Sequence, residues 1–96
     1  MKPKIGSTIS IFFADSTEIR KLNKKYRNKN YPTDVLSFNF NEDLPNGKRY
    51  IGDIVINCDL LENQAKENDH SVEEEIAYLA SHGVLHLLGV HHKGDE

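Results

Sequence analysis

The alternation of hydrophobic and polar positions along the chain predicts three strands. Residues 8–14 (TISIFFA) are β-branched and aromatic, a composition typical of a strand. Residues 34–40 (DVLSFNF) and 49–57 (RYIGDIVIN) alternate apolar and polar side chains, so one face of each should be buried against a core. Between them, Pro45 and Gly47 favour a loop. We therefore expect the second and third strands to pair as an antiparallel hairpin.

Two shorter segments have the spacing and start signals of helices. Asp15, with Glu18 three positions later, forms a capping-box pattern that opens a helix running to about Arg27. A second, shorter helix is expected through about residue 67, because Asp59 can serve as its N-cap.

The longest predicted helix covers roughly residues 72–88. Ser71 and Glu74 make a capping box at its start, and Gly89 ends it, because glycine readily takes the left-handed conformation there. The order strand, helix, strand, strand, helix, helix predicts an α+β (α/β-like) fold with a small mixed β-sheet packed against helices. We expect a single domain over residues 1–96, because so short a chain cannot bury a second core.

Charge is distributed unevenly along the chain, although the net charge is small. The net charge is -3, but residues 1–49 hold ten Lys or Arg and five Asp or Glu (+5), whereas residues 50–96 hold two and ten (-8). This asymmetry permits an anionic partner at one face. The apolar runs are too short for a membrane span and the start has no secretory pattern, so we expect a cytoplasmic protein without a membrane partner. The single cysteine, Cys58, is expected to be a buried apolar residue.

The strongest chemical signal is the histidine pattern of residues 81–92 (SHGVLHLLGVHH). His82 and His86 stand at positions i and i+4 of the last predicted helix, so their rings project from one face, with Cβ atoms about 5–6 Å apart. Two imidazoles at that separation can converge on one ion, each at roughly 2.0–2.1 Å. Gly89 then reverses the chain, so that His92 can supply a third nitrogen. Three protein ligands leave a position open, which is the arrangement of a catalytic zinc site.

Alternatives remain open at this site. His82 and His86 can instead be polar members of a helix face or hydrogen-bonded core residues. Neighbouring residues point apart, so only one of His91 and His92 should reach an ion, and the spacing favours His92. Zinc, at one ion per chain, is the expected metal, although three imidazoles also suit nickel, copper or iron.

The same spacing occurs in the metzincin proteases, whose motif His-Glu-x-x-His-x-x-Gly-x-x-His uses its Glu as general base. Gly83 occupies that position here, and a residue without a side chain cannot accept a proton. The predicted C-terminal helix is therefore metzincin-like in its zinc ligands, while peptide hydrolysis by the metzincin mechanism is disfavoured.

The stretch HGVLHLLGVHH closely resembles the signature His-Gly-x-Leu-His-Leu-x-Gly-Tyr-Asp-His of the YbeY family of bacterial endoribonucleases and rRNA maturation factors. Residues 23–38 (NKKYRNKNYPTDVLSF), 52–56 (GDIVI) and 64–65 are similar to further blocks of that family, in the same order. Val90 and His91 depart from the family's usual Tyr and Asp. The chain is also shorter at both ends than typical members.

The resemblance implies that His82, His86 and His92 are zinc ligands and that Arg27 is the arginine needed for RNA processing. A guanidinium can fork two hydrogen bonds to a phosphate and stabilise the charge that grows during cleavage. Arg27 can also be a solvated residue at a helix end, where a cation is favourable. A basic stretch surrounds it and is either an RNA footprint or a solvated face. Its members are Arg20, Lys21, Lys24, Lys25, Arg27 and Lys29.

The leading hypothesis is a metal-dependent endoribonuclease that prefers single strands and acts in rRNA maturation, including the 3′ end of 16S rRNA, and in ribosome quality control. Its implied catalytic residues are Arg27, His82, His86 and His92, and its implied partners are ribosomal RNA and the ribosome or its proteins. One alternative is a ribosome-associated binding module with a structural zinc. Another is a metal-dependent hydrolase of a different substrate. The oligomeric state is left open.

Overall fold

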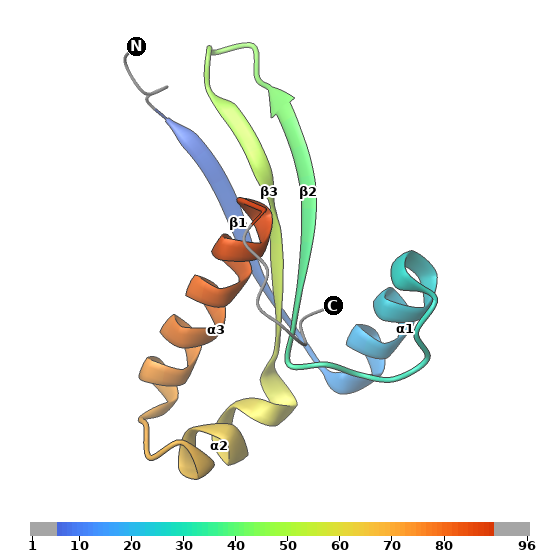
Figure 1. Ribbon diagram of the computed structural model, residues 1–96, viewed down its shortest axis with the longest axis vertical. Helices are drawn as coiled ribbons and strands as arrows, with labels where there is room; N and C mark the ends of the chain where they lie inside the picture. Colours follow the sequence, from blue (N-terminus) through green and yellow to red (C-terminus); the bar gives the residue numbers. More distant parts are fainter. Residues whose placement is uncertain (1–5, 90–96) are drawn as a thin grey trace.

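The computed structural model describes residues 6–89, and within them three strands and three helices follow the predicted order (Figure 1). The strands β1, β2 and β3 form one sheet of order β1-β3-β2, in which β1 runs parallel to β3 and β2 runs antiparallel to it. The predictions of an α+β fold, a mixed sheet and a hairpin are thereby confirmed. The elements are β1 Ser7–Ala14, α1 Ser16–Arg27, β2 Val35–Asp43, β3 Arg49–Asn57, α2 Cys58–Glu67 and α3 Val72–Leu87.

The central strand β3 separates two hydrophobic clusters, one on each face of the same sheet, because successive side chains of a strand point to opposite faces. Ile54 and Ile56 are fully buried and pack with Leu79 on the face that α3 covers. Val55 points the other way and packs with Ile19 on the face that α1 covers. Each of these aliphatic side chains contributes roughly 1.5–3 kcal/mol by leaving water. The helices α1 and α3 are therefore held on opposite faces of one thin sheet.

The helix ends follow the capping signals with one correction. The side chain of Asp15 accepts a hydrogen bond from the Glu18 backbone N–H at 2.8 Å, and Ser71 and Glu74 form a complete capping box. The helix α2, however, is capped by Asn57, whose Oδ1 accepts from the Asp59 backbone N–H at 3.0 Å. Asp59 instead accepts from the backbone N–H of Ser16 at 2.8 Å, which ties the start of α2 to the start of α1.

The prediction that Cys58 is buried is wrong. The chain leaves β3 at Asn57 and turns at once into α2, so Cys58 is the first helical residue and its side chain lies at the surface. Its Sγ lies 3.2 Å from the backbone oxygen of Ala14. Among residues 6–89, no helix is long and apolar enough to cross a membrane.

Candidate functional site

His82 and His86 lie side by side on α3. The buried side of this helix is made by Leu79, Gly83 and Leu87, which repeat every four residues and face the sheet. Each histidine precedes one of these buried positions, so both rings stand on the flank of the helix and are half-buried. Their ring centroids are 4.6 Å apart and their planes are tilted by 44°. The local prediction that the two imidazoles share one flank of the helix is confirmed.

This pair has the chemistry and spacing of two metal ligands. Imidazole nitrogen is a preferred zinc donor at about 2.0–2.1 Å, and rings this close can each turn one nitrogen to a common point. Within residues 6–89, no third His, Cys, Asp or Glu joins them in a cluster able to hold an ion. His91 and His92 lie outside the described residues. The described part of the chain thus contains two of the three predicted ligands, and the metal-binding role of all three stays a prediction.

Gly83 allows α3 to approach the sheet closely. A Cβ added there would lie 2.9 Å from Cγ2 and 3.0 Å from Cδ1 of Ile54, closer than side-chain atoms normally pack. The Gly83 carbonyl also accepts a hydrogen bond from the Ser37 hydroxyl at 3.2 Å, so the helix is held against β2 as well. This position therefore faces the core, and a Glu side chain there would collide with Ile54. The absence of a protease-type base, inferred from the residue alone, has a packing reason that the sequence did not reveal.

Gly52 plays the matching part on β3, beneath the last turn of α3. A Cβ at Gly52 would fall on the backbone carbonyl of Phe38 in the paired strand and lie 2.8 Å from Cδ2 of Leu87. Gly52 on β3 and Gly83 on α3 therefore both allow close packing between this strand and this helix. This contact sets how closely the last turn of α3, which carries His86, approaches the sheet.

A row of rings continues from the histidine pair towards the start of α3. The Tyr78 ring lies 6.4 Å from that of His82 and 6.5 Å from that of His70. His70 in turn places its Nδ1 3.3 Å from Oε1 of Glu75, a carboxylate that is 1% exposed. Asn68 donates to the same oxygen at 3.2 Å. The contact between His70 and Glu75 depends on the turn between α2 and α3, so the local sequence pattern does not predict it.

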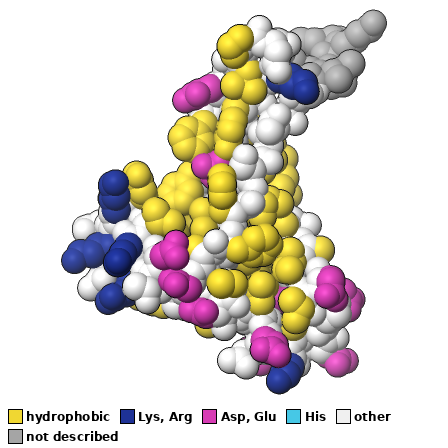
Figure 2. Space-filling model, turned by 180° about the vertical axis from the view of Figure 1, so that it is seen from behind, with side chains coloured by type: hydrophobic (Ala, Val, Ile, Leu, Met, Phe, Trp, Pro, Cys, Tyr) yellow, Lys and Arg dark blue, Asp and Glu magenta, His cyan; other side chains and the backbone are white. Residues whose placement is uncertain are grey.

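Arg27 is the last residue of α1, and it lies on a different element from the histidines. It is half-buried, and the next residue, Asn28, ends the helix in the left-handed conformation with φ 58°. Because α1 packs on the sheet face opposite α3, helix packing alone does not place Arg27 beside His82 and His86. The cations Arg20, Lys21, Lys24 and Lys25 are exposed on the same helix. Figure 2 shows Lys and Arg side chains gathered over α1, next to a hydrophobic surface.

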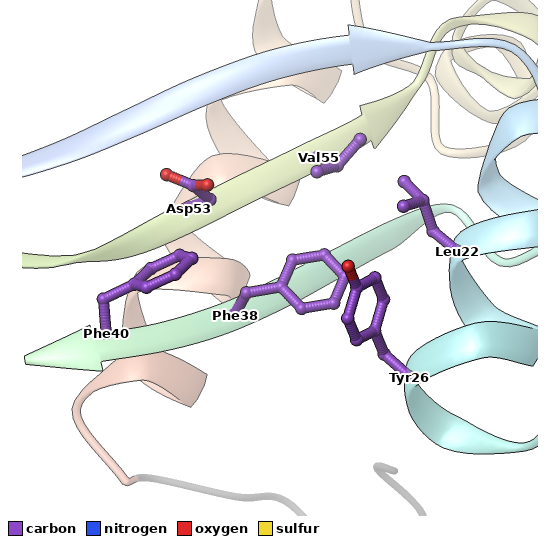
Figure 3. A pocket seen from close by; sticks show the side chains of 6 residues that line it. All are labelled: Leu22, Tyr26, Phe38, Phe40, Asp53 and Val55. Atoms are coloured by element: carbon purple, nitrogen blue, oxygen red, sulfur yellow. The ribbon is translucent and has the colours of Figure 1, made fainter.

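A hollow of about 270 Å³ opens on the face of the sheet that α1 covers only in part (Figure 3). It is lined by Leu22, Tyr26, Phe38, Phe40, Asp53 and Val55. Asp53 accepts a hydrogen bond from the Tyr50 hydroxyl, and this bond raises the pKa of Tyr50 above its ordinary 10.0. Phe38 and Asp53 belong to the paired strands β2 and β3 and lie opposite each other in register. What brings Tyr26 to them is the packing of α1, which local pattern does not predict.

Comparisons with known proteins match the chain over its length. The family model described as "Endoribonuclease YbeY" matches residues 1–96. Endoribonuclease YbeY of Aquifex aeolicus is 51% identical over 89 residues, which is 92% of this chain and 59% of that protein. The Picosynechococcus protein of the same name is 43% identical over 98 residues, which is 96% of this chain and 60% of that protein.

A solved structure shows a similar fold. The solution structure of TM1509 from Thermotoga maritima superposes with a TM-score of 0.54 at 30% sequence identity, covering 82% of this chain and 49% of that chain. The present chain therefore spans about three fifths of the length of the two curated relatives and about half of that structure.

Proposed function

The chain belongs to the YbeY family, and from this membership we propose that it acts as a metal-dependent endoribonuclease on single-stranded RNA. The observation that carries the proposal is the imidazole pair of His82 and His86, with ring centroids 4.6 Å apart on one flank of α3. A protease of the metzincin type is disfavoured by Gly83, because its position faces Ile54 and leaves no space for the Glu that such an enzyme uses as base.

The metal in this proposal is one zinc ion per chain, held by His82, His86 and His92. When bound, zinc supplies a Lewis acid that can activate water or polarise a phosphate oxygen. The fit rests on the two described rings, since imidazole is a preferred ligand of zinc. Another divalent transition metal would suit the same donors.

The residues of α1 have the chemistry needed to hold the RNA backbone. Lys24 and Lys25 stand in the last turn of α1 with Arg27, and they give that end of the helix a dense positive charge. Such a surface attracts phosphates with an affinity that falls as salt rises. Arg27 adds a planar fork of donors that can bind two phosphate oxygens and stabilise charge developing on the phosphate.

The substrate that family membership favours is ribosomal RNA, acted on in the cytoplasm during maturation of the small-subunit 16S 3′ end and during ribosome quality control. The ribosome or its proteins would then be partners. The chain spans about 60% of the length of these relatives. We therefore propose these substrates and partners for the part of the family protein that this chain represents.

Cleavage of a labelled single-stranded RNA by the metal-loaded chain tests the proposal. We expect His86→Ala and Arg27→Ala each to lower the rate strongly, since one removes a metal ligand and the other a phosphate contact. Arg49→Ala is the matched control, because it also removes an arginine, one that pairs with Asp43 at 2.9 Å on the exposed hairpin. It should cleave at the unchanged rate.

Equal cleavage by all these proteins would indicate a contaminating nuclease and defeat the assignment. Bound metal without any cleavage would favour a binding module with a structural zinc. Cleavage of peptides or esters instead of RNA would favour a hydrolase of another substrate.

The third ligand is tested by the metal content of the purified chain. We expect about one zinc per chain, and a marked loss in His92→Ala. His91→Ala is the matched control and should keep the metal. Unchanged zinc in His92→Ala, with loss in His91→Ala, would move the third ligand by one residue.

A further inference from the structure

The hollow between α1 and the β2–β3 hairpin combines exposed aromatic rings with one carboxylate. Tyr26 is 59% exposed and Phe40 is 48% exposed, so both rings are accessible to a ligand. Their side chains approach the hollow from different elements, Tyr26 from α1 and Phe40 from β2, while Asp53 lies above them on β3 (Figure 3). Phe38 lies between, with its ring centroid 5.4 Å from that of Tyr26 and nearly perpendicular to it, at 71°.

Positive charge lies directly beside these rings. The Nζ of Lys25 is 5.2 Å from the centroid of the Tyr26 ring, and further cations follow on the same helix. Figure 2 shows this face of the molecule, with the Lys and Arg side chains over α1 bordering the hydrophobic side chains of the sheet. Aromatic rings next to a cationic surface are the pattern by which proteins bind single-stranded nucleic acid: the cations attract the phosphates and the rings stack with bases.

The size and polarity of the hollow select a single base. A volume of about 270 Å³ lies at or below the small end of ordinary ligand pockets, roughly 300–1,000 Å³, so one planar ring system fits where a larger ligand does not. Asp53 is the one charged residue of the lining, and a carboxylate only accepts hydrogen bonds. Its bond from Tyr50 uses one oxygen and leaves capacity on the other for an amino group of a base.

We propose that this hollow is a binding site for one unpaired nucleobase that carries an exocyclic amino group, with Tyr26 and Phe40 as the stacking side chains and Asp53 as the acceptor. Cytosine presents such a donor at N4, whereas uracil presents an oxygen acceptor at the equivalent position, which the carboxylate repels. The inference rests on the proposed function, because it assumes that RNA is the ligand. It adds a base-selective site on the sheet face opposite the histidine pair.

Binding of short cytidine and uridine homopolymers of equal length tests this site. Fluorescence anisotropy is measured on the full chain with a chelator present, so that metal-dependent cleavage does not contribute. The unsubstituted chain should bind the cytidine oligomer more tightly than the uridine oligomer. Tyr26→Ala and Phe40→Ala should each weaken cytidine binding about tenfold, since stacking on one aromatic side chain is worth that much or more. Phe40→Leu keeps the apolar bulk without a ring and should weaken binding similarly.

Phe13→Ala is the matched control, because Phe13 is 54% exposed but pairs in register with Ile56 and so faces the side of the sheet that α3 covers. The affinity of the Phe13→Ala chain for the cytidine oligomer should not change. Asp53→Asn should remove the preference for cytidine, because an amide can donate to the uracil oxygen as well as accept from the cytosine amino group. A purely structural role of Asp53 would lower both affinities together and leave the preference as it was.

Equal binding of cytidine and uridine by the unsubstituted chain would overturn the proposal. So would unchanged affinity in Phe40→Leu and Tyr26→Ala, or a loss in Phe13→Ala as large as theirs. The proposed function fails separately, through the cleavage assay: base-selective binding with no cleavage would keep this site and remove the nuclease, whereas cleavage with no base preference would do the reverse.

Discussion

Replacing Gly83 by alanine should destabilise the protein even though alanine is the better helix former. The added Cβ would lie 2.9–3.1 Å from three side-chain carbons of Ile54, which is itself fully buried in the core between β3 and α3. Overpacking of a filled core costs typically 1–3 kcal/mol. The gain in helix propensity from glycine to alanine offsets roughly 1 kcal/mol of this. We therefore expect a net loss of about 0–2 kcal/mol, where propensity alone predicts a gain of about 1 kcal/mol.

Urea unfolding monitored by far-UV circular dichroism measures this change. Ala77→Gly is the matched control, because Ala77 is exposed on the same helix and reports propensity without packing. It should cost about 1 kcal/mol. A third variant, Ile54→Val, removes Cδ1, one of the crowding atoms, and by itself should cost roughly 0.5–1.5 kcal/mol.

The double variant Gly83→Ala with Ile54→Val decides whether the two side chains collide. If they do, it should be more stable than the sum of the single losses predicts, by about 0.5 kcal/mol or more, as expected for residues in contact. Strict additivity, or a Gly83→Ala protein that is stabilised by the full propensity gain, would refute the packing explanation. If His82 and His86 bind zinc as proposed, the zinc content of Gly83→Ala is a second readout and should fall when α3 moves outward.

Three other changes test separate features. Glu74 has a lowered pKa because its carboxylate accepts a hydrogen bond from the backbone N–H of the N-cap Ser71. The stabilisation from this bond is present above the ordinary pKa of 4.5 and is lost as pH falls through the lowered pKa, so the thermal midpoints of Glu74→Gln and the unsubstituted chain should converge below pH 4.5. A difference in midpoint that stays constant with pH would contradict this. The hydrogen bond that raises the pKa of Tyr50 stabilises the fold below the ordinary pKa of 10.0, and this stabilisation is lost as pH rises through the pKa of the folded protein. In Asp53→Ala, tyrosinate absorption should show one tyrosine titrating at a lower pH than in the unsubstituted chain. An identical titration curve would exclude the contact between Tyr50 and Asp53. Gly52→Ala should cost about 3 kcal/mol or more in urea unfolding, because its Cβ meets the backbone carbonyl of Phe38, which cannot move aside; a loss under about 1 kcal/mol would mean that the strands separate easily there.

Local signals were sufficient to predict the elements and the placement of two histidines on one flank of α3. The helix predicted from Asp15 to about Arg27 is found at Ser16–Arg27, because capping and helical periodicity depend on residues within one or two turns. The same locality explains why His82 and His86 were correctly expected on one flank: positions four apart in any helix are neighbours. The hairpin of β2 and β3 was predictable for a similar reason, since its strands are joined by a short loop with turn residues.

Other features depend on contacts between residues far apart in the chain. The parallel pairing of β1 with β3, the crowding of Gly83 against Ile54 and the meeting of Tyr26 with Phe38 appear only when the helices are placed on the sheet. The burial of Glu75 beside His70 could likewise not be predicted from the sequence, because a charged side chain in the first turn of a helix usually faces water. The catalytic role of Arg27 on α1 and the metal-binding roles of His82, His86 and His92 stay predictions, and His92 lies outside the described residues.

Short-range backbone and side-chain chemistry was therefore enough to identify the strands and helices and to place His82 and His86 on one flank of α3. Which faces of those segments meet depended on the packing of the whole chain. The tertiary structure turned two glycines into packing contacts and assembled an aromatic hollow beside a basic helix, because the positions of packed elements are set by the summed burial of many side chains rather than by any local pattern.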